Sequence, residues 1–197
     1  MLPFNALAAI LPLVTEFKRH GIGYYIGGSL AGSLYGRPRA TLDADLVADI
    51  ELKHVSPLVD ALESEYYIDA DMIREAIGRR SCFNLIHLAT SFKVDVFVIK
   101  NRPYDREAMK HIKRRTMQGD NTSQHLFFAS AEDILLAKLE WFRIGDEISE
   151  RQWSDITAIV RIQFERLDRS YLRYWAAELG VADLLDKAWK EVEADGR

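Results

Sequence analysis

Three aspartates in two segments could together bind a divalent metal ion. Asp43 and Asp45 are two positions apart in residues 41–48, and Asp95 lies within the apolar run 93–97, KVDVF. Residues two apart on a strand project to the same face, so Asp43 and Asp45 would lie side by side. Like charges this close repel unless a cation lies between them, and Mg²⁺ prefers such oxygen ligands. Three carboxylates around two metal ions, about 3.5–4 Å apart, can support in-line attack on a phosphate.

A glycine-rich turn precedes the aspartates. Gly27, Gly28 and Ser29 follow the short apolar run 23–26. Because glycine has no Cβ, the backbone of such a turn can approach a bulky anion closely. We expect Ser29 to cap a helix that runs to about Tyr35, and the N-terminus of a helix favours phosphate. The turn is therefore a candidate site for nucleotide phosphates.

Each of these features also has an ordinary structural explanation. The turn could serve only as a helix cap, and Asp43 and Asp45 could form the solvated face of a strand. Asp95 could be an edge-strand residue that blocks pairing with another chain. The order of the features is more specific than any one of them, because a glycine turn, an Asp-x-Asp strand and a later apolar strand with a central aspartate follow each other. We interpret the combination as a phosphate and metal site.

Two groups of basic residues could contact phosphates. Arg37 and Arg39 flank a proline in the loop before the aspartates, and arginine binds phosphate in a bidentate way. Arg37 could equally be a solvated loop residue. Residues 100–115 contain seven basic and two acidic side chains. Such a run could contact an RNA backbone or form a solvated helix face.

The hydrophobic pattern predicts a mixed α/β part followed by helices. The first part is expected to hold helices over 4–19, 29–35, 56–64, 70–78 and 106–115, and strands over 23–26, 41–48, 66–68, 81–88, 92–99 and 124–129. Four further helices are expected after caps at Ser130, Ser149 and Asp168 and from Ala182. The domains are thus 1–129 and 130–197. No linker separates them, so we expect the helical region to pack on the core.

The composition excludes several classes of protein. The chain has 197 residues and a net charge of -4, whereas a general nucleic-acid coat protein would be basic. Its single cysteine, Cys82, excludes an internal disulfide and a zinc site with several thiolates, and we expect a buried thiol in a reducing cytoplasm. No apolar run approaches the roughly 20 residues of a membrane span, so no membrane partner is expected. The apolar start lacks a preceding basic region and is expected to be a helix, not a signal peptide.

The glycine turn and the aspartates also carry a family resemblance. Residues 25–30, YIGGSL, and residues 39–46, RATLDADL, resemble the signature of the nucleotidyltransferase superfamily related to DNA polymerase β. The form Arg-x-Thr-x-Asp-x-Asp resembles the branch that holds the AbiEii-type toxins and minimal nucleotidyltransferases. Asp95 matches the third carboxylate of the family. Residues 131–139 resemble the helical motif of that branch, with Lys138, and residues 151–156 resemble its next motif, with Asp155.

The resemblance implies a fold and a set of roles. The fold would be α+β, with a nucleotidyltransferase-like mixed β-sheet core, flanking helices and a C-terminal helical bundle. Asp43, Asp45 and Asp95 would bind Mg²⁺ or Mn²⁺, and Asp95 could instead be the base. Lys138 would contact the triphosphate, and Asp155 would orient the Lys138 side chain. The nucleotide-binding residues would be Gly27, Gly28, Ser29, Arg37, Arg39 and Thr41. From the residues alone, Lys138 could equally extend from an apolar helix face to water.

The sequence therefore predicts a cytoplasmic, Mg²⁺-dependent nucleotidyltransferase. It would move a nucleoside monophosphate from an NTP to a hydroxyl of an RNA end, a protein or a small molecule. The alternative is a nucleotide-binding or toxin–antitoxin interaction module with little turnover, and an antitoxin partner fits either case. A phosphotransferase is disfavoured, because neither a P-loop Gly-x-x-x-x-Gly-Lys nor a kinase His-Arg-Asp motif occurs.

Overall fold

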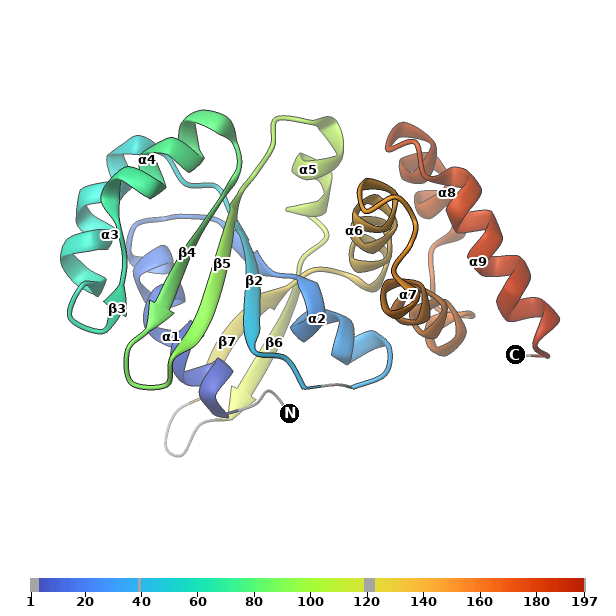
Figure 1. The fold of residues 1–197 in the computed structure, drawn as a ribbon, viewed down its shortest axis with the longest axis horizontal. Coiled ribbons are helices and arrows are strands. Elements are labelled where there is room, and N and C mark those ends of the chain that lie inside the picture. The colour runs from blue at the N-terminus through green and yellow to red at the C-terminus, as the bar shows by residue number, and fades with distance from the viewer. Residues whose placement is uncertain (1–3, 39, 119–122, 197) are drawn as a thin grey trace. The chain divides into compact units, whose positions relative to one another are not determined.

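The computed structural model describes residues 4–38, 40–118 and 123–196. The chain divides into two compact units. Unit 1 is Met1–Leu30 with Ala40–Phe128, and unit 2 is Ala31–Arg39 with Ala129–Arg197. The expected α+β class is confirmed, since strands and helices alternate in unit 1 and helices alone make up the described part of unit 2 (Figure 1). The expected packing of residues 130–197 on the core stays a prediction.

Within the described residues, unit 1 is built on a seven-stranded mixed sheet in the order β3-β4-β5-β2-β1-β7-β6 (Figure 1). The strands are β1 Tyr24–Ile26, β2 Asp43–Ala48, β3 Tyr66–Tyr67, β4 Cys82–His87, β5 Phe92–Val98, β6 Lys113–Gln118 and β7 Ser123–Phe128. Strand β2 runs parallel to β5 and β1 runs parallel to β7, while the other neighbours are antiparallel. The strands expected over 81–88 and 92–99 form as β4 and β5, which are antiparallel partners.

Helices cover one face of this sheet. The helices of unit 1 are α1 Phe4–Arg19, α3 Val55–Leu62, α4 Ala70–Arg79 and α5 Pro103–Ala108, with a 3₁₀ turn at Leu52–His54. Helix α1 packs on β5 and β2, and α4 packs on β4 and β5. The central strands turn their apolar side chains into the core, and Ala44, Leu46 and Val94 are fully buried. Because side chains alternate along a strand, the residues between them lie on the opposite face.

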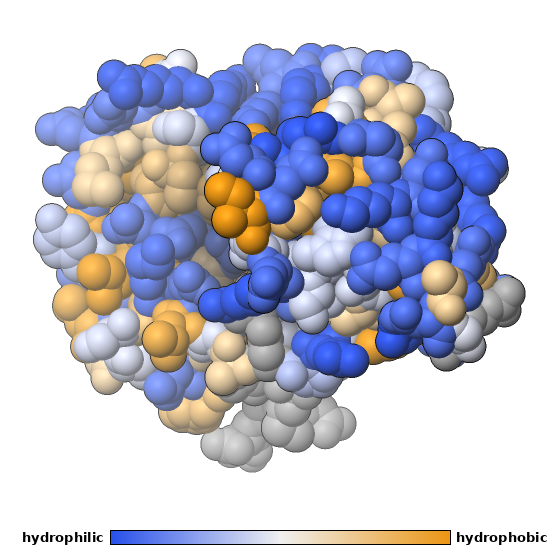
Figure 2. Space-filling model, turned by 45° about the vertical axis from the view of Figure 1, so that its right-hand side comes forward, coloured by the Kyte–Doolittle hydropathy of each residue, from blue (hydrophilic) through white to orange (hydrophobic). Residues whose placement is uncertain are grey.

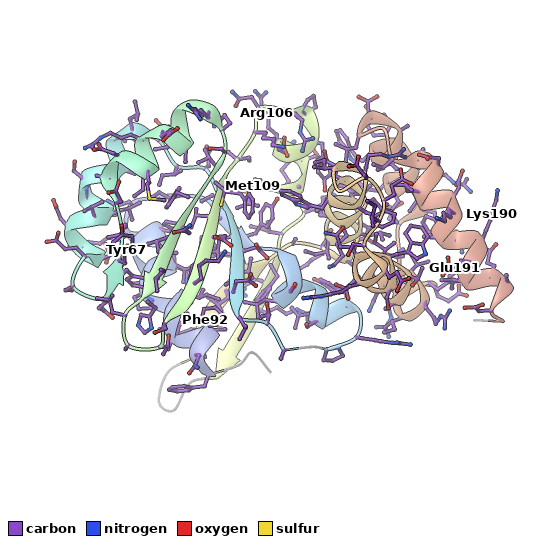
Figure 3. The ribbon with its side chains drawn as sticks, in the orientation of Figure 1. Tyr67, Phe92, Arg106, Met109, Lys190 and Glu191 are labelled. Atoms are coloured by element: carbon purple, nitrogen blue, oxygen red, sulfur yellow. The ribbon has the colours of Figure 1, made fainter. Side chains whose placement is uncertain are left out.

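Unit 2 is a group of helices with well-defined N-terminal caps. They are α6 Ala131–Ile144, α7 Glu150–Gln163, α8 Arg169–Glu178 and α9 Ala182–Ala194. The expected caps are confirmed, because Ser130, Ser149 and Asp168 each accept a hydrogen bond from a backbone N–H of the first turn. Glu191 of α9, labelled in Figure 3, accepts a hydrogen bond from Trp153 Nε1 of α7 at 2.8 Å.

Helix α2, Gly28–Tyr35, contributes to both units. Its first residues, up to Leu30, belong to unit 1, and the rest belongs to unit 2. In unit 2 the Tyr35 hydroxyl donates to the carbonyl of Ala129 at 2.9 Å, and Gln163 Nε2 donates to the carbonyl of Tyr35 at 3.0 Å. These bonds anchor the end of α2 among the helices of unit 2.

Several expectations about local structure were wrong. The basic helix expected over 106–115 does not form, because the helix starts early, with Pro103 in its first turn, and Lys113 begins strand β6, which pairs with β7. The Cys82 side chain is exposed, not buried, because it lies on the sheet face opposite the helices. Helix α3 begins at Val55, before the expected Ser56 cap.

The face of the molecule drawn in Figure 2 is mostly hydrophilic. Figure 2 shows polar and charged residues over most of the face in view, with hydrophobic residues scattered between them, in keeping with 28% charged residues. In the part of the chain that the structure describes, no helix is both long enough and apolar enough to cross a bilayer.

Candidate active site

The three predicted carboxylates lie on neighbouring strands in the middle of the sheet. Strands β2 and β5 are parallel partners, and their register places Asp45 directly beside Asp95. Asp43 is two residues before Asp45 and projects from the same face. Strand β5 lies between β4 and β2, so the alternative that Asp95 belongs to an edge strand is wrong. The structure thus brings Asp43, Asp45 and Asp95 together on the sheet face opposite α1 and α4.

The glycine turn lies against Asp45. The Gly27 N–H donates to the Asp45 carbonyl at 2.8 Å. Gly28 has a φ of +52°, and a Cβ added there would overlap the Asp45 carboxylate oxygen Oδ2. A side chain at position 28 is therefore disfavoured both by the backbone conformation and by the carboxylate. Helix α2 begins at Gly28, one residue earlier than expected, so Ser29 lies in the first helical turn.

The environment of Asp45 disfavours its ionised form. The pKa of Asp45 is raised to about 6, chiefly by burial and then by the charges of Asp43 and Asp95, while the Ser29 N–H and Lys93 act in the opposite direction. Burial has the largest effect because a charge loses its hydration when water is excluded. A carboxylate held in this state gains from any cation that binds beside it.

The other two carboxylates already have partners from the chain. The Thr41 hydroxyl donates to Asp43 Oδ1 at 2.8 Å, so the predicted nucleotide contact Thr41 orients an aspartate. Lys93 Nζ lies 2.7 Å from Asp95 Oδ2. Among the described residues, no three His, Cys, Asp or Glu side chains converge as they would around a bound metal.

The donor set nevertheless fits a magnesium ion. Its three carboxylates come from one face of two paired strands, and a cation there would offset the burial and like charges that raise the pKa of Asp45. Oxygen donors of this kind suit Mg²⁺ and Mn²⁺ more than softer metals.

Lys93 is a residue of this cluster that the sequence analysis missed. It pairs across the strands with Asp43, while Asp95, two positions on, pairs with Asp45. The signal was present in the sequence, since Lys93 and Asp95 are two apart on a predicted strand and must share a face.

The predicted pair Lys138 and Asp155 is formed within unit 2. Lys138 Nζ of α6 lies 2.8 Å from Asp155 Oδ2 of α7, and the two side chains are only 15% and 21% exposed. The lysine therefore does not simply extend to bulk water, as the alternative had it. Its neighbours Leu135, Leu136 and Leu139 are fully buried.

Gly32 of α2 gives the Lys138 side chain room. A Cβ added at Gly32 would lie 3.2 Å from Lys138 Cε. No pattern in the sequence links these two residues, because they are far apart along the chain. Gly32 is thus a second residue that the sequence analysis did not identify.

The other two predicted phosphate contacts, Arg37 and Arg39, belong to unit 2. Arg37 is exposed in unit 2, and Arg39 lies outside the described residues. The three aspartates and the glycine turn belong to unit 1, whereas Arg37, Lys138 and Asp155 belong to unit 2. That the two groups serve one site stays a prediction.

Solved structures share this architecture over nearly the whole chain. An antigenic nucleotidyltransferase-like protein from Paracoccidioides brasiliensis matches with a TM-score of 0.53 and 18% identity, covering 96% of this chain and 94% of its own. The chain has a nucleotidyltransferase-like fold. The solution structure of the antibiotic-resistance factor ANT(2'')-Ia also matches with a TM-score of 0.53, at 13% identity over 96% of each chain. Its crystal structure with adenylyl-2''-tobramycin gives 0.51, at 10% identity over 88% of this chain and 95% of the other.

Sequence comparisons identify no relative. No protein-family model and no curated protein matches the chain. The solved structures share so little sequence identity with this chain that they indicate its fold alone. The chemistry therefore has to be argued from the residues themselves.

Proposed function

We propose that this chain is a nucleotidyltransferase that moves a nucleoside monophosphate from an NTP to a hydroxyl group and releases pyrophosphate. The observation that carries the proposal is the contact between the glycine turn and the aspartate cluster. Gly28 leaves no space for a side chain between the turn and Asp45, and Asp45 lies beside Asp95 in the sheet. An anion-binding turn and a cation-binding cluster are thus neighbours, as transfer from a metal-bound triphosphate requires.

The residues of unit 1 would act as follows. Asp43, Asp45 and Asp95 would hold Mg²⁺ or Mn²⁺, which would supply charge neutralisation for the triphosphate and its leaving group. Gly27, Gly28 and Ser29 would lie against the phosphates at the start of α2, where the Gly27 N–H stays bonded to the Asp45 carbonyl. Thr41 would keep the Asp43 carboxylate in place through the hydrogen bond already formed. Asp95 would accept the proton of the attacking hydroxyl if it is not a metal ligand.

We further propose that Lys138 contacts the triphosphate and that Asp155 orients the Lys138 side chain. The ion pair at 2.8 Å in a mostly buried position supports a fixed lysine. An ammonium group held in this way can stabilise charge that develops on a leaving phosphate. Arg37 and Arg39 would add phosphate contacts from the loop before β2.

The acceptor is proposed at the level of its hydroxyl group. An RNA end, a protein side chain and a small hydroxylated molecule all remain candidates, and the adenylylated tobramycin bound to one protein of like fold supports including the last. Membership of the AbiEii-type branch, with an antitoxin as partner, is proposed from the residues 39–45 and 131–156 alone.

One labelling experiment tests the function. The full chain is incubated with each α-³²P-labelled NTP, Mg²⁺ and either total RNA, lysate protein or a panel of aminoglycosides. We expect label on one acceptor class and release of unlabelled pyrophosphate, and we expect none with Asp45→Asn. Absence of transfer with every NTP and acceptor, from folded protein that binds NTP, would favour the low-turnover interaction module instead.

A further inference from the structure

Four charged side chains form a compact block on the sheet face opposite α1 and α4. Strand β2 contributes Asp43 and Asp45, and strand β5 contributes Lys93 and Asp95. The register pairs Asp43 with Lys93 and Asp45 with Asp95, so each residue has a neighbour both along and across the strands. The block holds three negative charges and one positive charge. Lys93 is therefore the only cation that the two strands provide at this position.

Lys93 and its partner Asp95 differ in how much of each side chain is exposed to solvent. Asp95 is 15% exposed, whereas the Lys93 side chain is 45% exposed and reaches Asp95 Oδ2 at 2.7 Å. A bond between two charged groups at this distance is stronger than a neutral hydrogen bond. Lysine has a long, flexible side chain, and that of Lys93 is partly in solvent, whereas the shorter Asp95 side chain is mostly buried. The ion pair can thus open by movement of Lys93 alone.

We propose that Lys93 is the resident counter-cation of the aspartate cluster: it holds Asp95 while no divalent cation is bound and releases Asp95 when one binds. The second part of this inference rests on the proposed function, because it assumes that the cluster binds a divalent metal. Lys93 is on this basis a positioning residue. It keeps three neighbouring carboxylates from repelling each other in the empty protein and competes with the metal for one of them.

The two roles predict opposite effects of one substitution. Removal of the ammonium group leaves three uncompensated carboxylates, so the metal-free protein should become less stable. The same removal takes away a competitor for Asp95, so a divalent cation should bind more tightly. A residue that served only the fold would give the first effect without the second. A residue that helped to hold the metal or the substrate would weaken binding.

The test compares Lys93→Met with Lys53→Met in the full chain without nucleotide. Lys53 is a matched control, since its Nζ also pairs with a carboxylate two positions away, Glu51, at 3.0 Å, but both side chains are more than half exposed. Mn²⁺ binding is followed by the electron paramagnetic resonance signal of the free ion, and unfolding by calorimetry. For Lys93→Met we expect a melting temperature about 2–4 °C lower without metal and Mn²⁺ binding about fivefold tighter.

Two further variants keep the result interpretable. Lys93→Arg should retain the ion pair and behave like the wild type in both measurements. In an Asp95→Asn background, Lys93→Met should no longer lower the melting temperature. Mn²⁺ affinity that is equal or weaker in Lys93→Met, including no binding in either protein, overturns the inference. Failure of the proposed function is seen separately, as absence of nucleotide transfer by the wild-type chain.

Discussion

Asp45 and Asp95 are direct partners across the parallel strands β2 and β5, and Gly28 lies against the first of them. Burial raises the pKa of Asp45, and the neighbouring negative charges of Asp43 and Asp95 act in the same direction. A fold keeps such an arrangement only at a cost in stability. The cost can be measured without knowing the substrate, and it separates a site made for a cation from a solvated strand face.

The first prediction concerns the stability of metal-free protein as a function of pH. The folded chain holds the pKa of Asp45 at about 6, above the ordinary 3.8, so the folded state takes up a proton more readily than the unfolded chain. The free energy of unfolding should therefore rise as the pH falls through about 6 and level off below about 4. Asp45→Asn should remove this dependence and exceed the wild type by roughly 1–3 kcal/mol at pH 7.5.

Urea unfolding of both proteins in EDTA, from pH 4 to pH 8, measures the difference. The exposed Asp49→Asn is the control and should track the wild type across this range. A difference between Asp45→Asn and wild type that stays constant with pH would contradict the assigned shift.

The second prediction concerns transfer activity. Asp43→Asn and Asp45→Asn should each nearly abolish nucleotide transfer, because an amide binds a divalent cation far less well than a carboxylate. Both variants should keep the circular dichroism spectrum of the wild type, and Asp49→Asn should keep its activity. Wild-type rates in either variant would remove the aspartates from the mechanism.

The third prediction uses two glycines with the same backbone conformation. Gly28 has a φ of +52° and faces the Asp45 carboxylate, whereas Gly21 has a φ of +68° and nothing within 4 Å of an added Cβ. Alanine at either position should cost about 1–2 kcal/mol of stability through backbone strain. Only Gly28→Ala should also displace Asp45, and with it lose Mn²⁺ binding and transfer. Equal Mn²⁺ affinity in the two variants would mean that the turn does not position the carboxylate.

The fourth prediction concerns the ion pair of unit 2. Lys138→Met should lower the turnover number by about 10²–10³-fold, the loss typical when one group that stabilises developing charge is removed. The substitution also removes the ammonium group that lies 2.8 Å from the mostly buried Asp155 carboxylate, so it should lower stability as well. The double variant Lys138→Met with Asp155→Asn should recover the stability but not the turnover.

Lys190 supplies the control for that experiment, because it is an exposed lysine of the same unit, on α9 (Figure 3). Lys190→Met should leave both quantities unchanged. Full activity in the Lys138 single variant would assign the pair to structure alone.

Local sequence patterns were enough to predict most of the helices and strands. Ser130 was expected to cap a helix because Asp133 follows three residues later, and the structure forms that cap, with the Ser130 hydroxyl also donating to Asp133 Oδ2 at 2.6 Å. The basic run failed for the opposite reason. Its last residues, 113–115, belong to strand β6, which pairs with β7, and pairing between strands overrides a local helix pattern.

The residues of the candidate site could be predicted only in part from the sequence. The two-residue period of a strand predicts that Asp43 and Asp45 share a face. Their alignment with Asp95 depends on which strands become neighbours and in which register, and the sequence alone does not determine either. Lys93 could have been found by the same period. Gly32 could not, since its importance comes from the helix that packs against it.

The order of the strands has a last consequence, for the solubility of the molecule. In the described residues the sheet ends at β3 on one side and at β6 on the other, and an open edge invites association of one molecule with another. Strand β3 spans only Tyr66–Tyr67, too short to template a partner, and β6 presents Lys113, Arg114 and Arg115, all exposed, in succession. The basic residues that first suggested a nucleic-acid contact would also repel a second copy of this edge, as charged residues on edge strands do.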